Sequence, residues 1–116
     1  MNWPEPVIDL VRSGMHDVAT LGTGRRVRIR GTEVAAKTGS AEYDSGGQRK
    51  KNTWVVAFAP FENPTVAMAV LVEDGLSGGY TVAPLVHDVL VTIFGEPPPE
   101  EGEEIPEPAV EGGVGD

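Results

Sequence analysis

The chain has no cysteine among its 116 residues, and this absence excludes several kinds of chemistry. Without thiols there is no disulfide, no thiolate zinc site and no cysteine nucleophile. Histidine is scarce too, because only His16 and His87 occur, far apart in predicted helices. A metal site needs a cluster of ligands, so we interpret both histidines as polar residues of helix surfaces. The sequence predicts no metal site and no cofactor.

Long hydrophobic runs are also missing. The longest lie at 54–61 and 66–72, far below the roughly 18 or more apolar residues of a membrane-spanning helix. The N-terminal residues have neither the basic start nor the apolar stretch of a signal peptide. We therefore expect no membrane segment, signal or anchor within this chain.

Basic residues are absent from the C-terminal end. Residues 96–116 hold eight of the 18 acidic residues and half of the ten prolines, but no lysine or arginine. Residues 1–95 carry ten acidic and nine basic residues, so most of the formal net charge of −9 belongs to the end. We expect a disordered acidic Pro/Glu/Gly tail there, which either only solubilises the protein or docks onto a partner. The net charge argues against nucleic acid as a partner, but residues 1–95 by themselves are close to neutral. We expect no nucleic-acid partner.

The rest of the chain shows the periodicities of an α+β fold. Apolar residues recur at helical spacing over 5–21 and 81–94, which predicts two helices. A weak strand at 33–43 and two strong strands at 54–59 and 65–72 lie between them. Both strong strands are apolar on both faces, which is typical of strands covered on both sides. We therefore predict an antiparallel sheet of about three strands packed against N- and C-terminal helices.

Turn-forming residues indicate the connections. Residues 60–64 suit a hairpin link between the two strong strands, whereas 44–52 predicts a polar loop and 75–79 a flexible break. Residues 25–30 alternate arginine with apolar residues, as a short exposed strand or a loop would. Thr81 suits the N-cap of the last helix.

Glycines mark the ends of both helices. Gly22-Thr23-Gly24 follows a predicted helix rather than a strand. It therefore lacks the context of a nucleotide-binding loop, and we interpret it as a helix stop. Gly95 ends the last helix.

Basic side chains form two clusters in the sequence. Their members are Arg25, Arg26, Arg28 and Arg30, and then Arg49, Lys50 and Lys51. Aromatic residues do not interleave with them, as they would in a protein that binds single-stranded nucleic acid. We interpret the clusters as a solvated face, with a site for an anionic partner or lipid head group as the alternative.

The sharpest candidate site is Lys37-Thr38-Gly39-Ser40 on the weak strand. Alternation places Thr38 and Ser40 on one face and Lys37 and Gly39 on the other, so a ligand that uses both sets must lie along the strand's edge. Gly39 leaves room for another backbone to approach, and the hydroxyls with the ammonium suit a carboxylate. These properties describe an edge strand that captures a peptide C-terminus by strand addition.

The tetrapeptide belongs to a longer series of ordered motifs. In chain order these are Gly14-Met15, Gly22-Thr23, 34–42, 54–60, Asn63-Pro64 and 67–73. Lys-Thr-Gly is the third motif of penicillin-binding proteins and serine β-lactamases. From about residue 5 to 95 the series resembles the end of the transpeptidase domain of class B penicillin-binding proteins, most closely the penicillin-binding protein 2-like members. The resemblance implies the C-terminal part of a penicillin-binding/serine β-lactamase-like transpeptidase fold.

The resemblance also implies a function. Class B proteins are serine D,D-transpeptidases that cross-link peptidoglycan stem peptides ending in D-Ala-D-Ala, and β-lactams acylate the same serine. By this resemblance Lys37 is catalytic, because it supplies positive charge beside the nucleophile. Thr38 and Ser40 would hold the carboxylate, and Gly39 belongs to the edge that pairs with the ligand. The implied location is the periplasm, at the extracytoplasmic face of the bacterial inner membrane.

The chain departs from this family in its serines. None of the four has lysine three residues on or asparagine two residues on, so the S-x-x-K and S-x-N motifs are absent. We therefore expect residues 1–95 to be the C-terminal segment of a transpeptidase domain that needs the upstream half as a partner, and this chain alone to be inactive. The alternatives are a non-catalytic edge-strand module that binds peptide C-termini, and a serine β-lactamase remnant.

Overall fold

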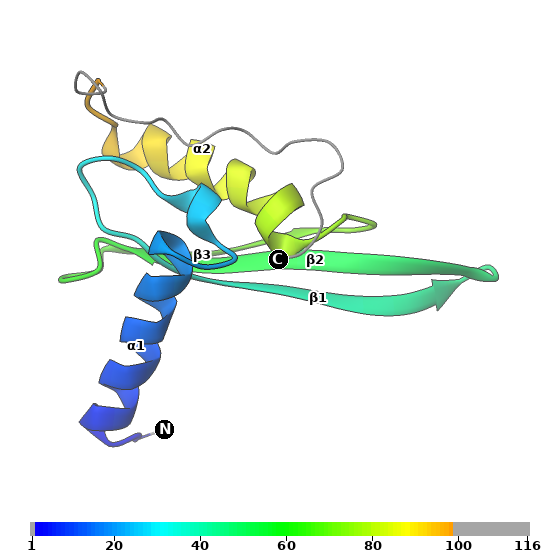
Figure 1. Ribbon diagram of the computed structural model, residues 1–116, viewed down its shortest axis with the longest axis horizontal. Coiled ribbons are helices and arrows are strands. Elements are labelled where there is room, and N and C mark those ends of the chain that lie inside the picture. The colour runs from blue at the N-terminus through cyan, green and yellow to red at the C-terminus, as the bar shows by residue number, and fades with distance from the viewer. Residues whose placement is uncertain (1, 99–116) are drawn as a thin grey trace.

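The computed structural model describes residues 2–98, in which helices flank an antiparallel sheet (Figure 1). The elements follow in the order α1 (Glu5–Thr20), η1 (Arg25–Val27), β1 (Ala35–Ser45), β2 (Gln48–Ala59), β3 (Val66–Val72), η2 (Gly78–Val82) and α2 (Ala83–Phe94). The element η1 is a short 3-10 helix, and η2 is a π-helical segment that leads directly into α2. The predicted α+β class, with its sheet between N- and C-terminal helices, is confirmed.

The sheet has the strand order β1-β2-β3. β1 and β2 form a long antiparallel hairpin in which Gly39 lies opposite Trp54. β2 and β3 are antiparallel as predicted, with Val56 opposite Ala69. Among the described residues β1 is therefore an edge strand, and no other strand pairs with its outer edge.

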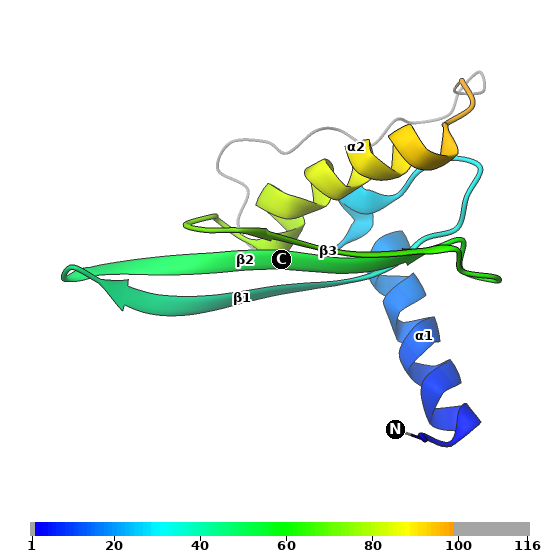
Figure 2. The ribbon, with the colours of Figure 1, turned by 180° about the vertical axis from the view of Figure 1, so that it is seen from behind.

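The two α-helices lie on opposite sides of the sheet. α2 runs along one face with η1 beside it, whereas α1 projects away from the other face and meets the sheet at its C-terminal end (Figures 1 and 2). Arg12 helps to hold α1 there, because its guanidinium donates to the Phe61 carbonyl at 2.7 Å. The same guanidinium carbon lies 5.5 Å from the ring centroids of Phe58 and Phe61.

The core lies on the α2 side of the sheet. Alternate residues of β2, namely Val55, Ala57 and Ala59, are almost fully buried and form one apolar cluster with Val86 and Leu90. This alternation follows from the strand pleat, which sends successive side chains to opposite faces. Leu90 is the largest fully buried side chain. Its truncation to alanine would cost about 2–5 kcal/mol of stability.

The opposite face of the sheet is only partly covered. Val56 is 37% exposed and Leu71 is 56% exposed. Within residues 2–98, α1 touches only one end of this face. The prediction that both strong strands are covered on both sides stays a prediction, because the remaining cover is expected from the upstream half of the domain. The apolar residues of α2 are also only partly buried. Val86 and Leu90 are buried, whereas Leu85 and Val89 stay exposed.

The predicted loop at 44–52 is wrong, because the chain continues as a strand on both sides of a two-residue turn. Gly46 and Gly47 have φ angles of +58° and +80°. Positive φ at both central residues characterises a type I′ hairpin turn, whose twist matches that of the flanking strands.

Salt bridges join the two strands of the hairpin next to this turn. Arg49 contacts Asp44 and Glu42 at 3.1 Å each. The hydrogen bond with Asp44 and then those with Glu42 raise the pKa of Arg49 above its ordinary value. Polar residues thus occupy both faces here, so the apolar alternation of a half-buried strand is missing from the sequence.

The approach to α2 also differs from the prediction. The π-helical η2 occupies the second half of the predicted flexible break at 75–79. The Ser77 side chain caps it by accepting a hydrogen bond from the Tyr80 amide at 3.0 Å. Thr81, the predicted N-cap, instead accepts a hydrogen bond from the Leu76 amide at 2.9 Å.

The glycine stops are confirmed. Gly95 has a φ of +77°, and its amide donates to the Val91 carbonyl at 2.8 Å. After α1, the Gly24 amide donates to the Val18 carbonyl at 3.1 Å.

Residues 25–30 are anchored rather than exposed along their whole length. Val27 and Ile29 are almost completely buried in the core cluster. A ring nitrogen of His87 lies 3.0 Å from the Arg28 carbonyl oxygen, which ties the segment to α2. The alternative of a short exposed strand is therefore wrong, because Arg25–Val27 form the 3-10 helix η1 and the apolar side chains of the segment are buried.

The remaining sequence predictions concern the histidines and the tail. His16 pairs with Glu33 at 2.7 Å. In the described part of the chain no three potential metal ligands group together, and no helix is long and apolar enough to cross a membrane. Of the predicted tail at 96–116, residues 99–116 lie outside the described residues, so its disorder stays a prediction.

Candidate functional site

The candidate site occupies the first half of β1, the edge strand of the sheet. Lys37 lies opposite Val56 of β2, and Ser40 lies opposite Thr53. One edge of this tetrapeptide is thus paired, while among residues 2–98 the outer edge has no strand beside it. The structure therefore agrees with the edge-strand geometry that the sequence predicts.

Thr38 is buried and its hydroxyl is held from a distant part of the chain. Thr38 is only 4% exposed. Its Oγ1 lies 2.7 Å from the Oγ1 of Thr23, which belongs to the turn after α1. Gly24 makes this turn possible, because a Cβ there would lie 2.9 Å from Cγ1 of Val18. The turn after α1 thus places the Thr23 hydroxyl beside Thr38 of the tetrapeptide.

Gly39 is required for a reason that the sequence did not indicate. A Cβ at this position would collide with the indole of Trp54, directly opposite on β2. The space on this face is therefore filled by a side chain, whereas the Gly78 backbone comes close to Gly39 elsewhere, since a Cβ at Gly78 would lie 3.0 Å from the Gly39 nitrogen. The approach of a ligand backbone to Gly39 stays a prediction. A ligand strand would approach Gly39 at the outer edge of β1, in the plane of the sheet.

A glycine-rich turn packs on the other face of the motif. A Cβ at Gly78 would lie 3.0 Å from Cβ of Thr38 and 2.5 Å from the Trp54 carbonyl oxygen. The backbone of η2 therefore rests almost directly on β1 and β2. This close approach fixes where α2 begins relative to the candidate site.

Lys37 and Ser40 are the exposed members of the tetrapeptide. The Lys37 ammonium donates to the Thr38 carbonyl oxygen at 2.7 Å, so it stays close to the strand. The site thus combines an ammonium, a buried hydroxyl and an exposed hydroxyl along one edge. These groups suit an anionic ligand with a peptide-like backbone, because they offer charge, O–H donors and an open strand edge.

The sequence does not place Thr23 or Trp54 beside the tetrapeptide. Gly22-Thr23 is one of the ordered motifs of the resemblance, but the Gly22–Gly24 turn is otherwise interpreted as a helix stop. A hydroxyl residue held between two glycines was the available signal. Trp54 was assigned to a strand, but its contact with Gly39 depends on the register between β1 and β2, which periodicity does not specify.

A Lys-Thr-Gly edge strand on such a sheet is typical of the class of penicillin-binding and serine β-lactamase-like proteins. Residues 3–91 match the family model described as the penicillin binding protein transpeptidase domain. The chain therefore belongs to the penicillin-binding protein transpeptidase family.

Two curated relatives refine this assignment. Over 83 residues the chain is 43% identical to the peptidoglycan D,D-transpeptidase PbpA of Mycolicibacterium smegmatis, a match that covers 64% of this chain and 16% of the relative. Over 104 residues it is 30% identical to the peptidoglycan D,D-transpeptidase MrdA of Salmonella typhimurium, covering 77% and 17%. The chain thus spans about a sixth of the length of these relatives.

Solved structures agree with the sequence relatives. Penicillin-binding protein 2B from Streptococcus pneumoniae superposes with a TM-score of 0.66 at 29% identity, covering 80% of this chain and 16% of that chain. The predicted resemblance to class B penicillin-binding proteins and the predicted fold are thereby confirmed.

Proposed function

We propose that this chain is the C-terminal part of a peptidoglycan D,D-transpeptidase that cross-links stem peptides through a serine acyl-enzyme. The observation that carries the proposal is the Lys-Thr-Gly-Ser tetrapeptide on an edge strand whose outer edge is unpaired among the described residues. The names of the relatives, both peptidoglycan D,D-transpeptidases, support the same activity. The site of action would then be the extracytoplasmic face of the bacterial inner membrane.

Each residue of the tetrapeptide has a proposed role. Thr38 and Ser40 hold the carboxylate of a D-Ala-D-Ala stem peptide or of a β-lactam, and the ligand backbone pairs with the outer edge of β1. Lys37 adds positive charge where the attacking serine and the carboxylate meet, which lowers the cost of gathering negative charge there. Gly39 leaves room for the Trp54 indole, with which a side chain at this position would collide.

The nucleophile is proposed to come from the upstream half of the domain. None of the four serines in this chain stands in an S-x-x-K or S-x-N motif. The serine of S-x-x-K would attack the D-Ala-D-Ala carbonyl, and an amine of a second stem peptide would then release the acyl group. Without that half, the chain supplies only the carboxylate-binding edge.

Fluorescent penicillin labelling tests whether the nucleophilic serine comes from the upstream half of the domain. We expect no covalent adduct on the 116-residue chain alone. Labelling should appear when the chain is co-expressed with the preceding part of the transpeptidase domain of the Mycolicibacterium relative. In that complex Lys37→Ala should abolish labelling, whereas Lys50→Ala on the hairpin should leave it unchanged. A covalent adduct on the isolated chain would contradict the proposal.

A second candidate function is supported by the missing serine motifs. The same open edge would serve a non-catalytic module that binds peptide C-termini by strand addition. Reversible binding of a D-Ala-D-Ala peptide to the isolated chain, with no labelling in the complex, would favour this module. Labelling in the complex would exclude it.

A further inference from the structure

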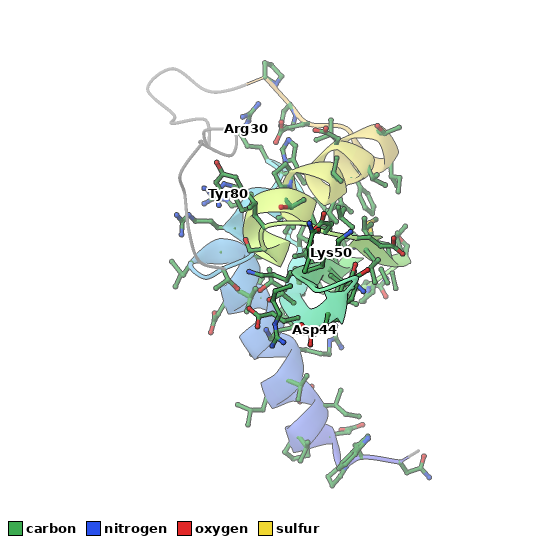
Figure 3. The ribbon with its side chains drawn as sticks, turned by 90° about the vertical axis from the view of Figure 1, so that its right-hand side faces the viewer. Arg30, Asp44, Lys50 and Tyr80 are labelled. Carbon is green, nitrogen blue, oxygen red and sulfur yellow. The ribbon has the colours of Figure 1, made fainter. Side chains whose placement is uncertain are left out.

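Arg26 is a cation held between two segments that both contact Thr38. It belongs to η1, and its guanidinium carbon lies 5.5 Å from the ring centroid of Tyr80 in η2. Figure 3 shows Tyr80 on the α2 side of the molecule, beside the chain that follows α1. In the part of the chain that the structure describes, no carboxylate forms a salt bridge with Arg26. Stacking on an aromatic ring holds a guanidinium without neutralising it, so Arg26 presents a fixed positive charge.

Two short stretches of chain connect Arg26 to the candidate site. Along the first, Arg26 follows Thr23 by three residues, which span at most roughly 10 Å. The Oγ1 atom of Thr23 lies 2.7 Å from that of Thr38. Along the second, Tyr80 follows Gly78 by two residues, and a Cβ at Gly78 would lie 3.0 Å from the Cβ of Thr38. The Arg26 guanidinium is therefore anchored close to the tetrapeptide from two directions.

The outer edge of β1 is accessible on only one side of the tetrapeptide. The two residues before it, Ala35 and Ala36, are completely buried, whereas the residues after it, 41–42, are exposed. A ligand strand on this edge can therefore extend from the tetrapeptide only toward the hairpin turn. Because the ammonium and hydroxyls of the tetrapeptide suit a carboxylate, a bound peptide would place its C-terminal carboxylate at the buried end. This is the end where Thr38 meets the turn after α1.

We propose that Arg26 selects ligands that end in a free carboxylate. The inference rests on the proposed function and adds the ligand group that Arg26 recognises. A carboxylate bound at Thr38 would be attracted by Arg26 as well as by Lys37, because the screening length at physiological salt is about 8 Å and partial burial weakens screening further. A neutral C-terminal amide gains nothing from the second charge. Arg26 would therefore widen the difference in affinity between the two kinds of ligand.

Tyr80 would act through Arg26 as a positioning residue. Its own place is fixed, because the Tyr80 amide donates to the Ser77 side chain at 3.0 Å. A guanidinium that already rests on a ring loses less entropy when a ligand binds. Arg28 provides a matched control, since it is exposed and its carbonyl oxygen lies 3.0 Å from a ring nitrogen of His87 in α2. Among residues 2–98 no aromatic ring holds the Arg28 guanidinium.

Peptide binding to the full 116-residue chain tests the inference. Acetyl-Gly-D-Ala-D-Ala and its C-terminal amide are titrated into the isotope-labelled chain, and NMR shifts of the backbone amides at 37–42 give both dissociation constants. We expect the acid to bind about tenfold more tightly than the amide. Arg26→Gln should reduce this ratio severalfold, Arg26→Lys should keep most of it, and Arg28→Gln should leave it unchanged. Raised salt should weaken binding of the acid and spare the amide.

The ratio of the two affinities separates an effect of charge from a change in structure. If Arg26→Gln merely displaced β1, it would weaken the acid and the amide alike. A constant ratio would therefore overturn the inference even where both affinities fall. Tyr80→Leu removes the ring beneath the guanidinium and should lower the ratio, whereas Tyr80→Phe should preserve it. An unaltered ratio in Tyr80→Leu would overturn the positioning role of Tyr80.

The same titration distinguishes failure of this inference from failure of the proposed function. If neither peptide shifts the amides at 37–42, the outer edge of β1 binds no peptide C-terminus, and both proposals are overturned. If the amides shift and the acid is preferred equally in the wild-type chain and in Arg26→Gln, only the role of Arg26 is overturned. The tetrapeptide would then recognise the carboxylate without help from Arg26.

Discussion

At the scale of single residues, the candidate site depends on one hydroxyl pair. Thr23 and Thr38 lie 15 positions apart, and their Oγ1 atoms are 2.7 Å apart. A hydroxyl has one proton to donate and lone pairs to accept. If Thr38 donates its proton to a ligand carboxylate, it must accept from Thr23. In the proposed function, Thr23 would then be a positioning residue, which orients the Thr38 proton toward the ligand.

The first prediction concerns this pair. Thr23→Val should lower the free energy of unfolding by about 1–3 kcal/mol, because the buried Thr38 hydroxyl loses its partner. Thr23→Ser keeps the donor and should restore most of that loss. Urea unfolding monitored by circular dichroism measures both. Thr92→Val removes a similar hydroxyl, bonded to the Asp88 carbonyl on the exposed side of α2, and should change stability by less than about 0.5 kcal/mol. Equal losses at the two threonines would contradict the prediction.

The second prediction concerns Gly39. Gly39→Ala should destabilise the chain by about 1–3 kcal/mol, because the added methyl group collides with Trp54 in a packed site. The same substitution should cost much less in a Trp54→Ala background, where the indole is gone. Gly14 lies within α1 with nothing near its Cβ position. Gly14→Ala should therefore stabilise by about 0.5–1 kcal/mol. A cost at Gly39 that persists without the indole would exclude the steric explanation.

At the scale of elements, the β1–β2 hairpin extends further than its apolar residues do. The hairpin reaches the Gly46–Gly47 turn, with Arg49 bridging Glu42 and Asp44. Cross-strand charge pairs and a turn of suitable handedness replace core packing there. The outer half of the hairpin therefore depends on local interactions, whereas the inner half depends on the core.

The third prediction follows from the backbone of that turn. Gly46→Val should destabilise by about 1–2 kcal/mol, because a β-branched residue disfavours a positive φ. Gly46→Asn should be tolerated, since asparagine followed by glycine suits a type I′ turn. Thermal unfolding of the two variants, side by side, measures the difference. A similar melting temperature for both would mean that the turn relaxes at little cost.

Sequence periodicity predicted those elements in which apolar residues recur at regular spacing. α1, β3 and α2 were placed within a few residues, and the motif strand was correctly assigned to an edge. The start of β2 was missed because residues 48–52 are polar on both faces. Contacts between distant residues were missed as well, since the Thr23–Thr38 bond depends on packing that a local pattern does not encode.

At the scale of the whole molecule, several large apolar side chains of the described residues are largely exposed. On α1, Leu10 is 74% exposed and Val11 is 56% exposed. On the open face of the sheet, Leu71 is 56% exposed. Contiguous apolar surface of this kind marks an interaction site or an aggregation liability. The proposed upstream half of the domain would be the natural partner for these faces.

The fourth prediction is that the isolated chain associates with itself as its concentration rises. Sedimentation velocity should show a growing fraction of larger species, and Leu10→Glu with Val11→Glu should reduce it, because the change removes contiguous apolar surface. Leu21→Glu alters a single exposed leucine outside α1 and should have little effect. A sedimentation coefficient that does not change with concentration would contradict this expectation.

The outer edge of β1, which pairs with no strand among residues 2–98, has a practical consequence. A free strand edge presents a row of N–H and C=O groups that any extended backbone can join, including that of another copy of the chain. Under the proposed function, a ligand that pairs with this edge would therefore compete with strand pairing between copies of the chain, and a D-Ala-D-Ala peptide added during purification would raise the solubility of the chain. The solubility of the stored protein, with and without the ligand, would then report whether a ligand occupies the outer edge of β1.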